Sequence, residues 1–138
     1  MAKRLGTLPF VKSVLKSFMA ESGLEPRLLG PHLRITNAAV GKVDFELDIT
    51  KDHTNRLKIL HGVSYLSAGG KIGDKISVTA VCDKIGKTLA YTSITFRNSK
   101  GELAARGSHT KYVAQAWKAQ EIPGPFTPPP GAEIDEEK

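Results

Sequence analysis

Residues 42–49 alternate strictly between charged and apolar side chains, and this pattern constrains the fold more than any other part of the chain. The apolar members are Val43, Phe45, Leu47 and Ile49, and the charged ones are Lys42, Asp44, Glu46 and Asp48. Successive side chains of a strand point to opposite faces, so the pattern predicts a half-buried antiparallel strand. The preceding run places Leu33, Ile35, Asn37 and Ala39 on one face. Gly41 between the two runs predicts the turn of a hairpin.

Three further runs predict strands over residues 74–84, 88–98 and 102–112. Gly86 separates the first pair, and residues 98–101 (NSKG) have the composition of a turn. Residues 63–67 are a shorter candidate strand, which Ala68-Gly69-Gly70 ends. Together with the hairpin, these runs predict an antiparallel sheet of five or six strands.

Residues 9–22 carry the apolar spacing of an amphipathic helix. The apolar positions are Val11, Val14, Leu15, Phe18 and Met19. Pro9 suits the first turn and Gly23 suits the end. Lys12, Ser13 and Lys16 are expected on the side facing water. A helix followed by an antiparallel sheet is an α+β arrangement.

The 138 residues, 40% of them hydrophobic, suit a single domain, which we expect over residues 1–112. Residues 113–138 contain five prolines and an acidic end, which predict an extended or disordered tail. No apolar run reaches the eighteen or so residues of a membrane span. The first 20 residues are basic and free of acids, which fits an amphipathic surface helix and also a mitochondrial presequence. The expected location is cytoplasmic or mitochondrial.

The net charge of +6 is unevenly distributed, with +9 in residues 1–112 and −3 in residues 113–138. A basic body suits a polyanionic partner: nucleic acid, an anionic membrane or the phosphates of coenzyme A. The sheet lacks a recognised RNA-binding motif, so nucleic acid is not the expected partner.

Cys82 is the only cysteine, so no internal disulfide forms, which fits a reducing compartment. It follows Ile76, Val78 and Ala80 on one apolar face, which predicts a buried structural thiol rather than a nucleophile. The four histidines lack metal-ligand spacing, and we expect neither a metal site nor a cofactor.

Several motifs, in order, resemble those of hotdog-fold acyl-CoA thioesterases, in the PaaI-like branch that includes thioesterase superfamily member 2. They are residues 52–55 (DHTN), 60–62 (LHG), 64–67 (SYLS), 73–74 (GD), 84–93 (KIGKTLAYTS) and 107–111 (GSHTK). The resemblance covers residues 8–112. It implies a curved antiparallel sheet around one long helix, assembly as a homodimer or homotetramer, and hydrolysis of acyl-CoA without a cofactor.

The resemblance also implies roles for individual residues. Asn55, His61 and Gly62 match the positions that orient the substrate and stabilise the oxyanion by backbone N–H groups. Basic residues are implied near the phosphates of coenzyme A, namely His109, Lys111, Lys87 and Arg56.

The chain departs from the family after Gly62, because Val63 alone separates it from the SYLS motif. The interval has no room for the central helix, so the sequence implies a hotdog-like sheet with that helix deleted. The helix normally carries a catalytic carboxylate, which leaves the general base unassigned. The alternative to an active thioesterase is therefore an inactive binding or oligomerisation module.

Loss of the helix would leave the concave face of the sheet uncovered. Burying four large apolar side chains is worth on the order of 6–12 kcal/mol, comparable to the stability of a domain. Three outcomes follow: the N-terminal helix covers the face, a partner covers it, or the chain folds poorly.

Overall fold

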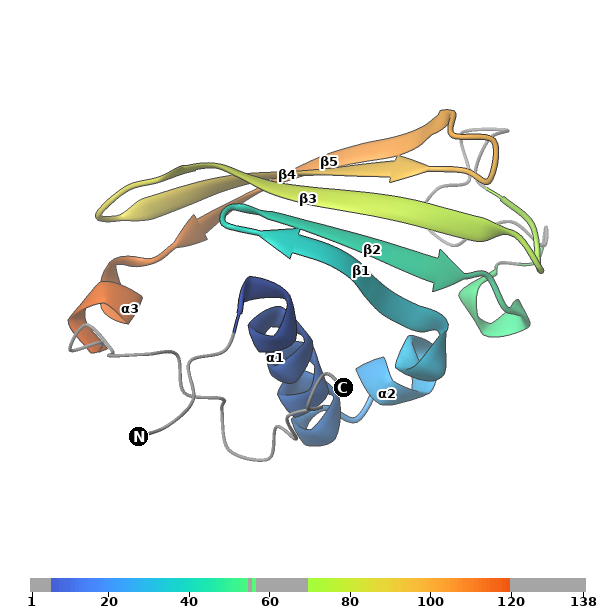
Figure 1. Cartoon of the computed structure of the whole chain (residues 1–138), viewed down its shortest axis with the longest axis horizontal. Coiled ribbons are helices and arrows are strands. Elements are labelled where there is room, and N and C mark those ends of the chain that lie inside the picture. Colours follow the sequence, from blue (N-terminus) through green and yellow to red (C-terminus); the bar gives the residue numbers. More distant parts are fainter. Residues whose placement is uncertain (1–5, 55, 57–69, 120–138) are drawn as a thin grey trace.

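The computed structural model describes residues 6–54, 56 and 70–119 (Figure 1). Five strands form one antiparallel sheet in the order β1-β2-β3-β4-β5, preceded by helix α1. The strands are β1 (Leu33–Ala39), β2 (Lys42–Asp48), β3 (Lys75–Ile85), β4 (Leu89–Arg97) and β5 (Leu103–Tyr112). The helices are α1 (Thr7–Glu21), α2 (Glu25–Leu28), α3 (Ala114–Ala119) and the 3-10 turns η1 (Gly30–His32) and η2 (Lys51–His53).

This arrangement confirms the predicted α+β fold and its hotdog-like sheet. The β1–β2 hairpin turns at Gly41, whose φ of 77° lies in the left-handed region that glycine tolerates. The bounds of β3, β4 and β5 agree with the predicted runs within one residue. Residues 63–67, the sixth candidate strand, lie outside the described part of the chain.

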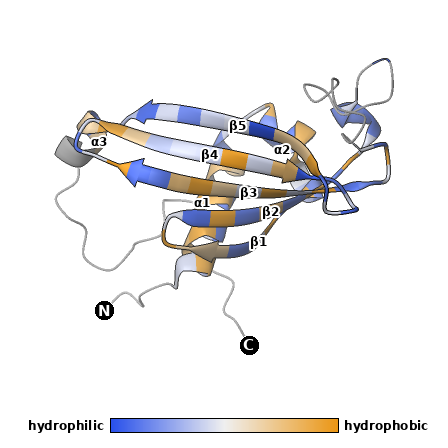
Figure 2. Cartoon of the chain, turned by 90° about the horizontal axis from the view of Figure 1, so that it is seen from above, coloured by the Kyte–Doolittle hydropathy of each residue, from blue (hydrophilic) through white to orange (hydrophobic). Residues whose placement is uncertain are grey.

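The apolar side chains of the strands gather on the face of the sheet that is turned toward α1, which we call the inner face. Register places Phe45 opposite Val78, and Val78 opposite Phe96, in one row across three strands. Ile49, Ile76 and Val78 form the buried core, with Phe45, Ile94 and Phe96 packed against them. Figure 2 views the opposite, outer face and shows hydrophilic and hydrophobic residues alternating along β2 and β3.

A β-bulge interrupts the alternation in β1. Ile35 pairs with Phe45, and the next pair joins Asn37 to Asp44. Thr36 is therefore an extra residue that has no pairing partner on β2. The prediction that Asn37 and Ala39 share the face of Ile35 is therefore wrong. Both are exposed, while Ala38 is half-buried.

The burial of helix α1 differs from the prediction at several positions, although Lys12 and Lys16 are exposed as predicted. Ser13, expected to face water, is 2% exposed, and Ser17 is 7% exposed. Val14 and Phe18 from the predicted apolar stripe are 43% and 53% exposed. Ser13 Oγ donates a hydrogen bond to the backbone oxygen of Phe10 (2.7 Å), so the buried hydroxyl is satisfied within the helix.

Helix α1 packs chiefly against β1, at one edge of the sheet (Figure 1). Of the three outcomes expected for the uncovered inner face, partial covering by α1 is therefore observed.

The chain continues from β5 into the short helix α3, at the start of the segment that was expected to be a tail. Residues 120–138 lie outside the described part. Over the described ranges, no helix is long and apolar enough to cross a membrane.

Candidate functional site

The three residues implied to be catalytic, Asn55, His61 and Gly62, lie outside the described residues. The described chain fixes both ends of their segment at the same end of the sheet. The backbone N–H of Ile49 donates to the backbone oxygen of Asp74 (2.9 Å), and the backbone N–H of Gly73 donates to the backbone oxygen of Ile49 (2.9 Å). The segment thus leaves the sheet just after β2 and returns just before β3.

His53 anchors the beginning of this segment. Its side chain is 5% exposed, and its Nδ1 accepts a hydrogen bond from the backbone N–H of Thr50 (3.0 Å). Its Nε2 lies within hydrogen-bond reach of the backbone oxygen of Leu28. A carbonyl oxygen only accepts, so Nε2 carries the hydrogen and Nδ1 is bare. Both nitrogens are occupied, which gives His53 a structural role in the loop.

Three of the four implied phosphate-binding residues lie at one end of the sheet. We call Lys87, His109 and Lys111 the basic corner. Lys111 pairs with Ala90 and His109 pairs with Thr92, so both lie on the inner face. Val113 N–H donates to the Thr88 oxygen (2.8 Å), which holds the end of β5 against the turn that carries Lys87. All three residues of the basic corner are exposed.

Arg56 lies at the opposite end of the sheet from the basic corner. It follows η2, beyond the last residue of β2, and Asp48 of β2 pairs with Lys75 at the start of β3. The 11 residues of β3 separate the two ends by roughly 35 Å, at about 3.3 Å per residue. The structure therefore does not bring Arg56 together with the basic corner.

The inner face offers no carboxylate among the strand residues that the structure describes. The acidic residues of β2 point outward: Thr79 Oγ1 donates to Asp44 (2.7 Å), and Arg34 binds both Asp48 and Glu46. Lys75 Nζ lies 3.2 Å from Glu46 Oε2. These pairs stabilise the charged carboxylates on the surface. A general base for hydrolysis is therefore not supplied by the described strands.

The same contacts shift the acid–base equilibria of the outer face. The hydrogen bond with Arg34 lowers the pKa of Asp48 below its ordinary value. Lys75, and to a lesser degree Arg34, lowers the pKa of Glu46. Both groups remain charged acceptors, so neither is suited to take up a proton near neutral pH.

Cys82 is half-buried rather than buried, which corrects the prediction. It lies on the inner face with Ile76 and Val78, as its spacing indicated, but at the end of the sheet where α1 leaves a groove open. No group of three potential metal ligands occurs in the portion of the chain that is described.

The sequence analysis missed the burial of Ser13 and Ser17. No motif marks these serines. The signal was their spacing of four residues, which places both on one side of a helix.

No family model matches the chain. Human acyl-coenzyme A thioesterase 13 is 31% identical over 134 aligned positions, which cover 75% of this chain and 94% of the relative. Since 75% of 138 residues is about 104, about 30 of those positions have no counterpart in this chain.

Solved structures are similar over the same region. Zebrafish thioesterase superfamily member 2 matches with a TM-score of 0.67 and 30% identity, over 78% of this chain and 99% of the other. A thioesterase of Streptococcus pneumoniae crystallised with coenzyme A has the same fold, with a TM-score of 0.54 and 14% identity, over 59% of this chain and 88% of the other. The shared sheet and the identity to thioesterase 13 lead to one conclusion: the chain belongs to the hotdog-fold acyl-CoA thioesterase family.

Proposed function

We propose that this protein binds acyl-CoA thioesters and hydrolyses them to a free acid and coenzyme A. The observation that carries the proposal is the similarity to acyl-coenzyme A thioesterase 13 over 94% of that protein. A thioesterase of the same fold is crystallised with coenzyme A, which supports coenzyme A as the group that this chain binds. The phosphates of coenzyme A then account for the basic charge of residues 1–112, in place of nucleic acid.

In the proposed reaction, water attacks the thioester carbonyl carbon, the C–S bond breaks, and coenzyme A leaves as the thiol. Backbone N–H groups at His61 and Gly62 stabilise the oxyanion, and Asn55 orients the carbonyl. The water needs a base, which the described strands do not provide on the inner face. Residues of the segment between β2 and β3 are the proposed source.

The alternative is binding without hydrolysis. It is motivated by the length of the chain, since about 30 positions of the human relative have no counterpart here. A chain that has lost the central helix would retain the sheet and lose the base.

Hydrolysis is tested by release of free thiol from short-, medium- and long-chain acyl-CoA by the purified chain. His61→Ala is the test variant, and His32→Ala, outside the family motifs, is its matched control. Turnover that falls at least tenfold in His61→Ala and persists in His32→Ala supports the proposed reaction. A folded protein that binds acyl-CoA but releases no thiol supports the inactive alternative.

The family also supports proposals on organisation. We propose a domain over residues 1–112 with a proline-rich tail from residue 113, assembly as a homodimer or homotetramer, and a cytoplasmic or mitochondrial location. Val14 and Phe18 of α1, both exposed in the single chain, are available for burial between subunits. Light scattering on the eluting protein would give the number of chains directly.

A further inference from the structure

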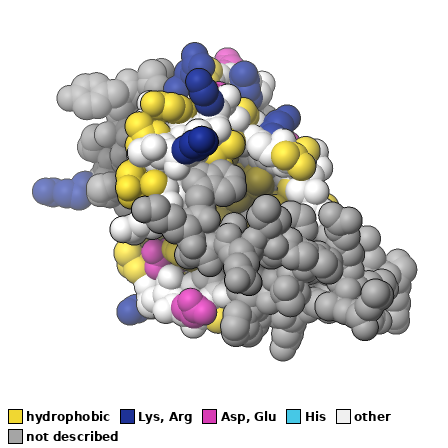
Figure 3. Space-filling view, turned by 90° about the vertical axis from the view of Figure 1, so that its left-hand side faces the viewer, with side chains coloured by type: hydrophobic (Ala, Val, Ile, Leu, Met, Phe, Trp, Pro, Cys, Tyr) yellow, Lys and Arg dark blue, Asp and Glu magenta, His cyan; other side chains and the backbone are white. Residues whose placement is uncertain are grey.

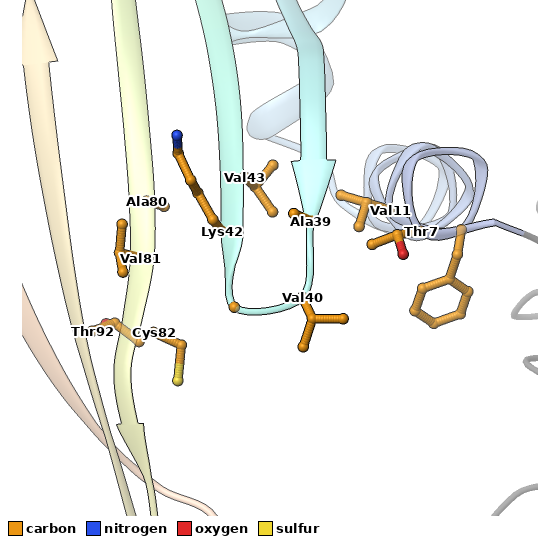
Figure 4. Close-up of a pocket in the computed structure, with 12 residues that line it drawn as sticks. Thr7, Val11, Ala39, Val40, Lys42, Val43, Ala80, Val81, Cys82 and Thr92 are labelled. Carbon is orange, nitrogen blue, oxygen red and sulfur yellow. The ribbon is translucent and has the colours of Figure 1, made fainter.

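A groove lies between the first half of α1 and the end of the sheet that carries the β1–β2 turn (Figure 4). Its volume is about 520 Å³, within the range of about 300–1,000 Å³ typical of small-molecule sites. Thr7 and Val11 of α1 stand on one side, and Ala39 and Val43 of the hairpin stand opposite them. Cys82 and Thr92 belong to the inner face beyond the hairpin.

The lining of the groove suits an aliphatic ligand. Lys42 is the one charged residue among the twelve that line it, and its Nζ lies 3.7 Å from Asp44. The Thr92 hydroxyl donates to the backbone oxygen of His109 (2.9 Å), so its hydrogen is already used. Most of the remaining lining is hydrocarbon, which gains free energy when a chain of methylenes displaces water from it.

His109 and Lys111 of the basic corner lie on β5, beside the edge of the groove that Thr92 forms. Thr92 lines the groove and pairs with His109 of β5 on the same face, and directly opposed side chains in a sheet have Cβ atoms about 4.5–5.5 Å apart. Lys111 follows two residues later on that face. Asp83 is the neighbour of Cys82 in the sequence. Its carboxylate points to the outer face, where it accepts a hydrogen bond from Ser93 Oγ (3.2 Å). The edge of the groove next to β5 therefore has basic side chains beside it.

Figure 3 views this end of the molecule. Lys and Arg side chains stand among hydrophobic ones around a hollow in the described surface. Apolar walls with a cationic end complement a molecule that has a hydrocarbon chain and one anionic end group.

We propose that this groove binds a free fatty acid, with the hydrocarbon chain between α1 and the sheet and the carboxylate at the basic corner. The inference rests on the proposed function for the class of ligand, since hydrolysis of acyl-CoA releases such an acid. The site lies at the opposite end of the sheet from the point where the segment carrying Asn55 and His61 begins. The basic corner is also the implied place of the coenzyme A phosphates, so the free acid and coenzyme A would compete for it.

Calorimetric titration of the full chain with octanoate, decanoate and dodecanoate tests the proposal. We expect saturable binding of one acid per chain, with affinity rising more than tenfold for every two methylenes added. Dodecanol has the same chain without a carboxylate, and Lys111→Ala should weaken dodecanoate about threefold to fivefold while leaving dodecanol unchanged. Affinity that does not depend on chain length would overturn the proposal.

Cys82→Trp fills the groove and should lower the affinity for dodecanoate at least tenfold. Ser77→Trp is the matched control, because Ser77 lies on the same strand, is exposed and points to the outer face. Equal affinities of the two variants for dodecanoate would contradict binding in this groove. Circular dichroism checks that both variants fold.

Val40→Glu keeps the test decisive if Cys82→Trp does not fold. Val40 stands in the β1–β2 turn at the mouth of the groove and is 95% exposed, so its replacement does not disturb the core. A carboxylate there should weaken dodecanoate about threefold to fivefold by repulsion and desolvation, and an unchanged affinity would contradict the assignment.

Thiol release from acyl-CoA is measured on the same proteins, so the two proposals fail separately. If dodecanoate binding is weakened by Cys82→Trp and no thiol is released, the fatty-acid site is supported and the proposed hydrolysis is rejected. If the protein releases thiol but its fatty-acid binding does not depend on chain length, the proposed hydrolysis is supported and the fatty-acid site is rejected.

Discussion

The imidazole of His53 is hydrogen-bonded through Nε2 to the backbone oxygen of Leu28, and so joins the loop after β2 to the end of α2. The same ring accepts a hydrogen bond from Thr50 N–H. His53 therefore connects two parts of the chain separated by 25 residues, at the point where the segment with the implied catalytic residues begins.

His53→Ala should lower the free energy of unfolding by about 2–4 kcal/mol, because it leaves the Leu28 oxygen and the Thr50 N–H without partners in a buried place. Urea unfolding followed by circular dichroism measures the loss. His109→Ala, at an exposed position, should change stability by less than about 0.5 kcal/mol. Equal effects of the two variants would contradict the structural role of His53.

Gly70→Ala should destabilise the protein by about 2–4 kcal/mol. Gly70 has a φ of +80°, and a Cβ there would lie 2.6 Å from Cδ1 of Ile49. Ile49 is 2% exposed, so its terminal methyl has little space into which to move. Gly73→Ala isolates the backbone contribution, since Gly73 has a φ of +93° and open space around its Cα.

Ile49→Val removes the clashing methyl and should partly rescue Gly70→Ala. On its own, Ile49→Val should cost about 0.5–1.5 kcal/mol. A double-mutant cycle by urea unfolding should show a favourable coupling of at least about 1 kcal/mol. Strict additivity would mean that the close approach of Gly70 to Ile49 does not limit stability.

Substitutions in α1 should follow the observed orientation of the helix. Ser13→Leu should destabilise by about 1–3 kcal/mol, because the larger side chain does not fit at a position that is 2% exposed. Phe18→Ser, at a site 53% exposed, should change the stability of the single chain by less than about 0.5 kcal/mol. Thermal unfolding at low protein concentration compares the two, and the reverse order of effects would place Phe18 in a buried contact.

Stability should fall as the pH drops below about 5. The pKa values of Asp48 and Glu46 are lowered in the folded state by Arg34 and Lys75. A lowered folded-state pKa adds stability above the unfolded-state pKa, and that stability is lost as the pH falls through the folded-state value. Unfolding free energies measured from pH 6 to pH 3 should show the decline.

Arg34→Met should make that decline shallower, because it removes the main partner of Asp48. Arg106→Met removes the same charge from an exposed position of β5 and should leave the slope unchanged. Identical slopes in the two variants would show that net charge, rather than this ion pair, sets the acid sensitivity.

Alternation along residues 42–48 was sufficient to predict β2, because half of its side chains face the core and half face water. The same argument failed halfway along β1. The alternation rule assumes one residue per pairing position, and a bulge adds a second residue at one position. No characteristic residue type marks this bulge in the sequence.

The orientation of α1 could not be predicted from the helix alone. Val14 and Phe18 are the larger hydrophobic side chains, yet they are exposed, while Ser13 and Ser17 are buried. Which face docks depends on the shape of the strand beneath it, and this is a tertiary property. The implied site was predictable only through family motifs, and those motifs place the basic corner together but leave Arg56 apart.

Thr36 makes β1 tolerant of a shortening that most strands would not survive. Removing one residue from a regular strand moves every later side chain to the opposite face of the sheet. Here the strand already holds one residue more than its partner, so a chain without Thr36 would regain an even ladder while Ile35 and Ala38 kept the faces they have now. Natural length variation in this hairpin is therefore expected to begin at residue 36.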